Sequence, residues 1–150
     1  MKVELSVEQL LCQHSALKQD WENLQTIPGA AKTTATAILA QTPDLSSFKS
    51  ARQLAAYAGL TPAHKASGTS LRGKSKLSKV GSSALRKAIY FPAIVAKNHN
   101  PILKAFAQKL AKKGKHTMVI IGAAMRKLLH IIFRILKNKV PFESIALTNL

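Results

Sequence analysis

Residues 62–87, PAHKASGTSLRGKSKLSKVGSSALRK, form a basic segment on which the interpretation of the whole chain depends. The segment holds seven Lys/Arg, seven Ser/Thr and no carboxylate, and it has few large apolar residues. Three glycines interrupt it, so we expect a loop that leads into a helix from about Ser83, with a short β-hairpin turning near Gly73 as one form of that loop. Cations, hydroxyls and glycines together let a backbone approach phosphates closely, which predicts a surface that faces a polyanion.

Charge is distributed unevenly along the chain. The formal net charge is +17, and no acid lies between Leu45 and Phe142, although twenty of the twenty-three Lys/Arg lie there. The six acids are Glu4, Glu8, Asp20, Glu22, Asp44 and Glu143. An acidic partner would meet an almost purely cationic body, so nucleic acid is the partner that we expect. An anionic membrane surface is the alternative.

Length and composition favour one globular domain. A chain of 150 residues that is 47% hydrophobic and 19% charged can bury a substantial core, which argues against disorder. Cys12 is the only cysteine, so neither a disulfide framework nor a thiolate metal cluster is expected. The N-terminus lacks the long apolar core of a signal peptide. Charged residues interrupt the apolar run Met118–Leu136, which favours a buried helix over a membrane span and predicts a cytoplasmic protein.

The N-terminal residues predict a single amphipathic helix. Ser6 and Gln9 form a plausible capping box for a helix that runs to about Leu24. Its apolar positions follow a heptad spacing, with His14 as the odd member: Val7, Leu10, His14, Leu17, Trp21 and Leu24. Such a helix either packs on its own domain or ends a coiled coil that joins another domain or protomer. We therefore divide the chain into a linker helix (1–24), a domain (25–140) and a tail (141–150).

A turn at Ile27-Pro28-Gly29 separates this helix from an Ala/Thr-rich helix that ends near Gln41. The arrangement is similar to the helix-hairpin-helix element, in which the turn and the second helix present backbone N–H groups to a phosphate. Pro28, Gly29 and Lys32 are the candidate contacts. Ala31 stands where the element usually has a second glycine, which weakens the phosphate assignment. Alternatively, the turn only connects two packed helices.

Further helices complete a mainly α fold. Ser50 and Gln53 are expected to cap a short helix, Ala51–Ala58, that ends at Gly59. Its expected core residues are Leu54, Ala55 and Tyr57. The helix that follows the basic segment starts at Ser82 or Ser83, and Pro92 is expected to kink it.

Two more helices are expected before the C-terminus. Asn100 caps a helix with Pro101 at its first position, and Gly114 ends it. A long helix then covers roughly Thr117–Asn138, and the tail after Pro141 should be frayed. One stripe of the long helix is basic: Arg126, Lys127, His130, Arg134 and Lys137. The stripe is either a solvated face or a second strip of phosphate contacts.

The residues argue against several kinds of catalysis. The five histidines are scattered, and two-metal phosphoryl transfer needs convergent carboxylates, which this chain almost lacks outside its ends. What remains is Ser67, which precedes Gly68 and lies near Lys65 and Arg72. A serine hydroxyl is a weak nucleophile until a base takes its proton, whereas nearby cations stabilise the charge of a phosphoryl transition state. Spacing alone does not separate a nucleophile from a hydrogen-bonding residue, nor select among the loop hydroxyls Ser67, Thr69 and Ser70.

An ordered set of short motifs now points to a family. The motifs are Ile27–Gly29, Phe48-Lys-Ser-Ala-Arg-Gln-Leu-Ala-Ala-Tyr-Ala-Gly-Leu-Thr-Pro62, Ser67-Gly68, Lys79-Val-Gly81, Leu85-Arg86, Asn100-Pro101 and Gly114-Lys115. Together they resemble the C-terminal transposase domain of the insertion-sequence one-ten family, also called Piv/MooV-type or RNA-bridged transposases. The resemblance covers roughly Leu24 to Leu136.

The resemblance implies a mechanism. Family members join a RuvC-like domain, whose four acids bind Mg²⁺, through a coiled coil to a helical domain like this one. Ser67 would be the nucleophile that forms a phosphoserine link to the cleaved DNA strand. Two protomers would share a composite site, as a homo-oligomer, and a structured guide or bridge RNA would select the DNA.

These 150 residues differ from that pattern because they contain no RuvC-like domain and no metal-binding acids of that kind. The chain is expected to be an excised or truncated C-terminal piece or a remnant reading frame, which binds nucleic acid but cleaves it poorly or not at all. Lys65 and Arg72 would stabilise charge, and Gly68 would give access to the phosphate. Backbone contacts are assigned to Lys74, Lys76, Lys79, Arg86 and Lys87. The alternative function is a non-catalytic nucleic-acid-binding or assembly module, in which Ser67 only donates a hydrogen bond.

Overall fold

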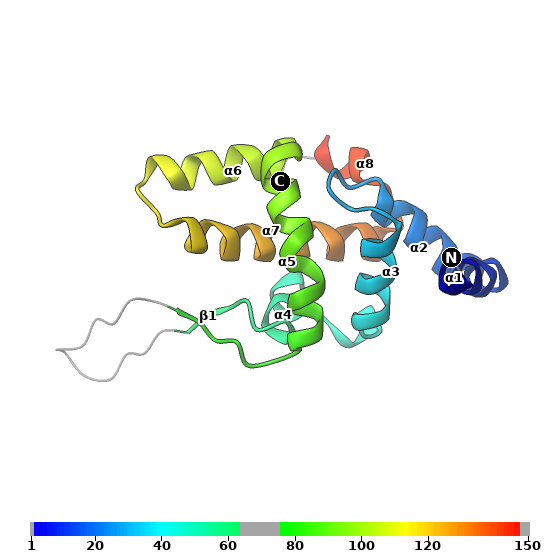
Figure 1. The fold of residues 1–150 in the computed structure, drawn as a ribbon. Coiled ribbons are helices and arrows are strands. Elements are labelled where there is room, and N and C mark those ends of the chain that lie inside the picture. The colour runs from blue at the N-terminus through cyan, green and yellow to red at the C-terminus, as the bar shows by residue number, and fades with distance from the viewer. Residues whose placement is uncertain (1, 64–75, 148–150) are drawn as a thin grey trace.

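The computed structural model describes residues 2–63 and 76–147, and most of them are helical (Figure 1). The elements are α1 (Lys2–Gln13), α2 (Ser15–Gln25), α3 (Lys32–Gln41), η1 (Leu45–Ser47), α4 (Ala51–Tyr57), β1 (Pro62–Ala63), β2 (Lys76–Leu77), α5 (Ser83–His99), α6 (Pro101–Lys112), α7 (Thr117–Asn138) and α8 (Phe142–Ala146). The mainly α fold expected from the sequence is confirmed. Among the described residues, none of the helices combines the length and the apolarity that a membrane crossing requires.

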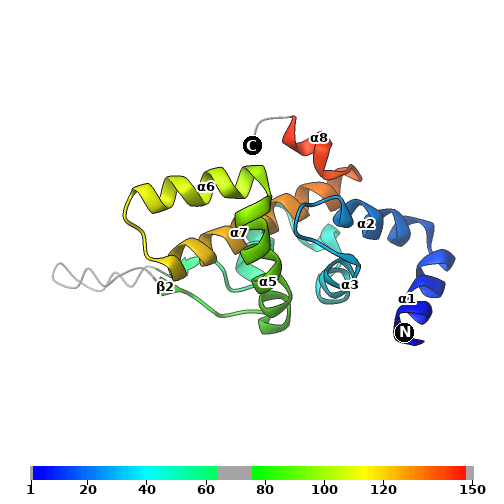
Figure 2. The same ribbon diagram turned by 45° about the horizontal axis from the view of Figure 1, so that its top comes forward.

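Helix α7 is the centre of the core. Twelve of its residues are buried, because α2, α4, α5, α6 and α8 all pack on it. Helix α6 runs alongside α7, and α5 crosses it (Figures 1 and 2). A helix covered on several sides must be apolar over most of its surface, which explains the buried apolar residues between Ile120 and Leu136. Packing does not explain Met118 and Val119 at its start, because both are more than half exposed.

Capping residues set the ends of the C-terminal helices where the sequence predicts them. The Ser82 hydroxyl accepts a hydrogen bond from the Leu85 N–H (3.1 Å), and the Asn100 side chain accepts one from the Ile102 N–H (3.0 Å). These bonds satisfy N–H groups that the first turn of a helix leaves free. The kink expected at Pro92, which lies inside α5, stays a prediction.

The single N-terminal helix expected from Ser6 to Leu24 is wrong. His14 is extended (φ −126°, ψ 95°) and separates α1 from α2, and the Ser6 hydroxyl bonds to the Lys2 carbonyl within α1 instead of capping it. Leu11 of α1 is buried in the core, although it is not one of the heptad positions. Trp21 and Leu24 of α2 are heptad positions, and both are buried. Two leucines at heptad positions, Leu10 and Leu17, remain exposed. A coiled coil through this segment stays a prediction.

Two further expectations are corrected by tertiary packing. The tail after Pro141 is not frayed over Phe142–Ala146, because Phe142 and Ile145 are buried against the core and the Phe142 N–H donates to the Thr26 hydroxyl (2.8 Å). Tyr57 is 38% exposed instead of buried, and its ring meets that of Phe48 edge-on.

Candidate nucleic-acid interface

The start of the basic segment meets its middle at the strand pair β1–β2. Pro62 pairs with Leu77 and Ala63 with Lys76, in antiparallel register. This pairing agrees with the short hairpin expected from the sequence, although the turn near Gly73 lies outside the described residues. The same holds for the predicted nucleophile and its neighbours, namely Lys65, Ser67, Gly68, Arg72 and Lys74.

Backbone hydrogen bonds fix the second end of the segment against the end of α4. The Lys79 N–H donates to the Gly59 carbonyl (3.1 Å), and the Ser82 N–H donates to the Tyr57 carbonyl (2.6 Å). Arg86 adds to this junction, since its Nη1 donates to the carbonyl of Ala58 at 3.0 Å and contacts that of Lys79 at 3.5 Å. Part of the Arg86 guanidinium therefore holds the fold together, and its phosphate contact stays a prediction.

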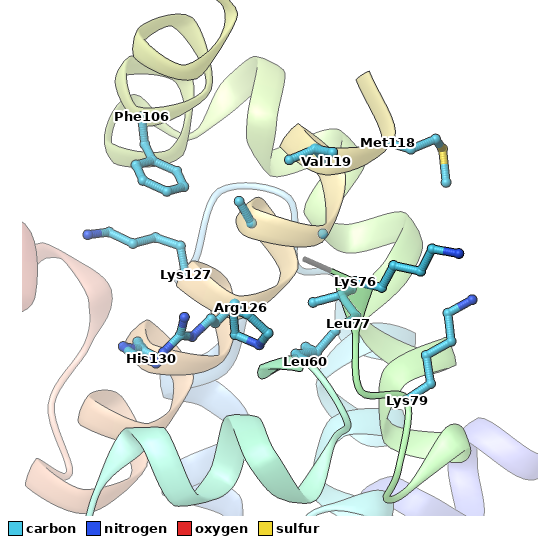
Figure 3. Close-up of a pocket in the computed structure, with 13 residues that line it drawn as sticks. Leu60, Lys76, Leu77, Lys79, Phe106, Met118, Val119, Arg126, Lys127 and His130 are labelled. Atoms are coloured by element: carbon cyan, nitrogen blue, oxygen red, sulfur yellow. The ribbon is translucent and has the colours of Figure 1, made fainter. Parts of the chain in front are cut away.

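A cleft of about 730 Å³ opens beside this junction, between β2, α6 and the first half of α7 (Figure 3). Its floor is apolar, and its rim carries Lys76, Lys79, Arg126, Lys127 and His130. The apolar lining consists of Leu60, Pro62, Leu77, Phe106, Met118, Val119, Gly122 and Ala123. No carboxylate is among these lining residues. We call this hollow the basic cleft.

Three residues of the basic stripe on α7, Arg126, Lys127 and His130, line one side of the basic cleft, whereas Arg134 and Lys137 do not line it. Lys127 Nζ lies 5.4 Å from the centre of the Phe106 ring, and Arg126 Nε and His130 Nε2 are buried with no hydrogen-bond partner among the described residues. The pKa of His130 lies below its ordinary value, first because of burial and then because of the charges of Arg126, Lys127 and Arg52. The imidazole is therefore neutral at pH 7.

The predicted contacts at the first turn are separate from the basic cleft. A Cβ on Gly29, whose φ is +104°, would lie 3.0 Å from the Ala96 nitrogen, so the turn faces α5. Lys32 pairs with Glu8 (3.2 Å) and lies over the Trp21 ring (5.8 Å). These contacts support the interpretation in which the turn connects packed helices, and phosphate binding by Pro28, Gly29 and Lys32 stays a prediction.

Most cations of the described body have no carboxylate partner. In residues 2–63 and 76–147 there are two ion pairs, Lys32–Glu8 and Lys139–Asp20. Lys76, Lys79 and Lys87 are exposed and belong to neither. They remain available to an anionic ligand.

Sequence reasoning missed the apolar half of the basic cleft. Phe106 of α6 lines the cleft, and Met118 and Val119, which also line it, are 59% and 53% exposed. The available signal was an excess of apolar residues around the start of α7, beyond what one packed face requires.

The described residues offer no fit for Mg²⁺. They contain no group of three or more His, Cys, Asp or Glu side chains that could hold a metal ion. Carboxylates are the ligands that Mg²⁺ requires, so a metal expected from the family resemblance would have to be held outside this part of the chain.

Comparison with known proteins identifies the family. A family model described as "Transposase IS116/IS110/IS902 family" matches residues 21–108. The chain belongs to this transposase family. The family resemblance inferred from its motifs is thereby confirmed.

Individual relatives agree with this assignment. The pilin gene-inverting proteins of Moraxella bovis and Moraxella lacunata are each 40% identical over 121 residues, which is 80% of this chain and 38% of theirs. An uncharacterized 43.6 kDa protein of insertion element IS110 from Streptomyces coelicolor is 32% identical over 122 residues, 81% of this chain and 30% of its own. The chain thus spans less than two fifths of the length of these relatives.

Proposed function

We propose that this transposase-family chain is a DNA-binding domain that contributes a serine nucleophile to strand cleavage and transfer. The observation that carries the proposal is the basic cleft at the base of the basic segment, whose rim is cationic and whose lining holds no carboxylate. Lys76 and Lys79 of this rim belong to a segment that is rich in hydroxyls and glycines, and Arg126 and Lys127 belong to α7. Such a surface attracts a polyphosphate backbone and stabilises added negative charge on it.

In the proposed chemistry the Ser67 oxygen attacks a backbone phosphorus. A bond forms between that oxygen and phosphorus, and the bond from phosphorus to a sugar oxygen breaks. The serine proton passes to an acceptor outside this chain, and the leaving sugar oxygen takes up a proton from water. Lys65 and Arg72 stabilise the charge on the phosphoryl oxygens, and Gly68 allows the phosphate to come close. Lys74, Lys76, Lys79, Arg86 and Lys87 hold the flanking backbone.

The proposal extends to partners that the family resemblance implies. A RuvC-like domain holds Mg²⁺, a structured guide or bridge RNA selects the DNA, and two or more protomers assemble the active complex in the cytoplasm. The described residues supply no carboxylate cluster for the metal, which is consistent with this division of labour.

DNA binding is tested by its salt dependence. The logarithm of the affinity should fall linearly with the logarithm of the salt concentration, with a slope of about −0.9 for each phosphate neutralised. Lys76→Ala and Lys79→Ala should each reduce the slope by about one. Lys18→Ala, which removes an exposed charge from α2 far along the chain from the basic cleft, should leave the slope unchanged. A shallow slope for the unmodified chain contradicts DNA binding through these cations.

The nucleophile is tested by trapping a covalent adduct. The chain is combined with a RuvC-like domain and a nicked or bridged DNA substrate, and protein-linked DNA is detected after denaturation. Ser67→Ala should abolish the adduct, whereas Ser70→Ala in the same loop should retain it. An adduct that persists in Ser67→Ala would show that another residue is the nucleophile. Absence of any adduct with the unmodified chain, which still binds DNA, would support the second candidate function, a non-catalytic binding or assembly module that the cationic cleft also fits.

A further inference from the structure

The basic cleft has an apolar floor that phosphate binding alone does not explain. Its volume of about 730 Å³ lies in the range of small-molecule pockets. Met118 and Val119 stay more than half exposed at its edge. A surface that only held phosphates would need cations and backbone N–H groups, and it would not need a hollow lined by Phe106 and aliphatic side chains.

The cations flank this floor on two sides. Figure 3 shows the amines of Lys76 and Lys79 on one side and that of Lys127 on the other, with Val119, Leu77 and Leu60 between them. An occupant that matches the arrangement has a flat apolar part in the middle and negative charge at both ends. One nucleotide of a strand, with the phosphates before and after it, has this form.

We infer that the basic cleft holds one unstacked base of a single-stranded or locally unpaired nucleic acid, while Lys76 and Lys79 contact one flanking phosphate and Lys127 the other. The inference rests on the proposed function and deepens it. Paired bases in a duplex are stacked and cannot enter a pocket, whereas unpaired bases can be turned out and stacked on an aromatic side chain such as Phe106. The polar edge of the base would face Arg126 Nε and His130 Nε2, two nitrogens of the cleft lining that lack hydrogen-bond partners among the described residues.

A rival occupant is α1 of a second copy, which carries exposed Leu5 and Leu10 together with Glu8. The nucleotide is favoured for two reasons. Glu8 is already paired with Lys32 of its own chain, so this carboxylate is not free to pair with the cations of the cleft. In addition, Lys76 lies within the basic segment, so the cleft continues the surface that we assign to the nucleic-acid backbone.

The experiment fills the pocket without changing its charge. Ala123 lines the cleft, and Ala123→Leu occupies the space of the base. The probes are a single-stranded DNA oligonucleotide carrying 2-aminopurine, an RNA of the same sequence and the corresponding DNA duplex. Ala123→Leu should weaken single-strand binding about 5- to 150-fold, the range found for losing one stacked base. Duplex binding and the salt slope should not change.

Matched controls make the result decisive. Ala105→Leu makes the same substitution on an exposed part of α6 that does not line the cleft, and it should bind as the unmodified chain does. Val119→Gln removes apolar contact at an exposed position, so it keeps the test valid if Ala123→Leu does not fold. Circular dichroism establishes folding for each variant.

The outcomes separate the two proposals. If single strands and duplexes bind with a steep salt slope but the cleft variants bind single strands normally, the base pocket is wrong and the proposed function stands. If the unmodified chain binds no nucleic acid, both are wrong. If sedimentation shows a dimer that Ala123→Leu dissociates while strand binding is unchanged, the cleft belongs to a second copy and the inference is overturned.

Discussion

The close approach of residue 81 to the end of α4 predicts that Gly81→Ala severely destabilises the protein. Gly81 has φ +139°, a conformation that residues with a Cβ rarely adopt. A Cβ at this position would overlap the Tyr57 carbonyl oxygen and lie 2.9 Å from the Tyr57 carbonyl carbon. Both are main-chain atoms at the end of α4, so they cannot rotate away as a side chain would.

The expected cost has two parts. Forcing alanine into this backbone conformation costs about 1–3 kcal/mol, and the steric overlap adds about 1–3 kcal/mol. We expect the free energy of unfolding to fall by about 2–6 kcal/mol. For a chain of this length that corresponds to a melting temperature lower by about 4–24 °C. Gly114 provides the control, because it has φ +75° but a Cβ added there would meet no atom within 4 Å. Gly114→Ala should cost about 1–2 kcal/mol, which is the conformational part alone.

Urea denaturation followed by circular dichroism measures both variants under the same conditions. The difference between them reports the contact with Tyr57 together with the greater backbone strain at φ +139° than at φ +75°. Equal free energies of unfolding for Gly81→Ala and Gly114→Ala would refute this reasoning. They would show that a Cβ at position 81 fits beside the Tyr57 carbonyl without a steric penalty. The same pair tests the basic cleft, because Gly81→Ala should displace Lys79 and weaken strand binding, whereas Gly114→Ala should not.

Three further predictions concern stability and charge. Asn100→Ala should lower the free energy of unfolding by about 1–2 kcal/mol in thermal denaturation, because it removes the cap of α6. The pKa of His130 is lowered by burial and by nearby cations, so the unfolded chain binds more protons than the folded one. The free energy of unfolding should therefore decrease as the pH falls below about 6.5 and through the folded-state pKa. His130→Gln should flatten this decrease, whereas His99→Gln at an exposed site should not. Arg86→Lys should lower the free energy of unfolding in urea by about 1.5–3 kcal/mol, because it loses the hydrogen bond to the Ala58 carbonyl. Lys87→Ala should instead mainly reduce the salt slope of DNA binding.

Local signals in the sequence predicted the helices whose ends depend on local chemistry. The start of α5 follows from Ser82, the start of α6 from Asn100 with Pro101, and the end of α6 from Gly114, each of which acts on the residues next to it. Capping and proline or glycine preferences operate within one turn, so they are visible without the tertiary structure.

Features that depend on distant residues could not be predicted in the same way. The break at His14 interrupts the heptad spacing with no proline or glycine near it. Helix α8 is held by a hydrogen bond from the Phe142 N–H to the Thr26 hydroxyl, 116 positions earlier. The basic cleft forms where Leu77, Phe106 and α7 come together. These parts are far apart in the sequence, so the sequence alone did not indicate that they are neighbours. The motifs identified the family, but they did not indicate that a pocket lies beside the basic segment.

Some cations of this chain stabilise the fold and others have no partner among the described residues. The net charge therefore overstates the positive charge that is available to a ligand. Lys32 and Lys139 are paired with carboxylates, and Arg86 bonds to main-chain carbonyls. Lys76 and Lys79 have no such partner among the described residues and lie at the edge of an apolar hollow. Phosphate attraction weakens with salt, whereas apolar contact with a base persists. Binding at high salt should therefore retain the preference for unpaired strands after most of the duplex affinity is lost, and this preference should disappear in Ala123→Leu.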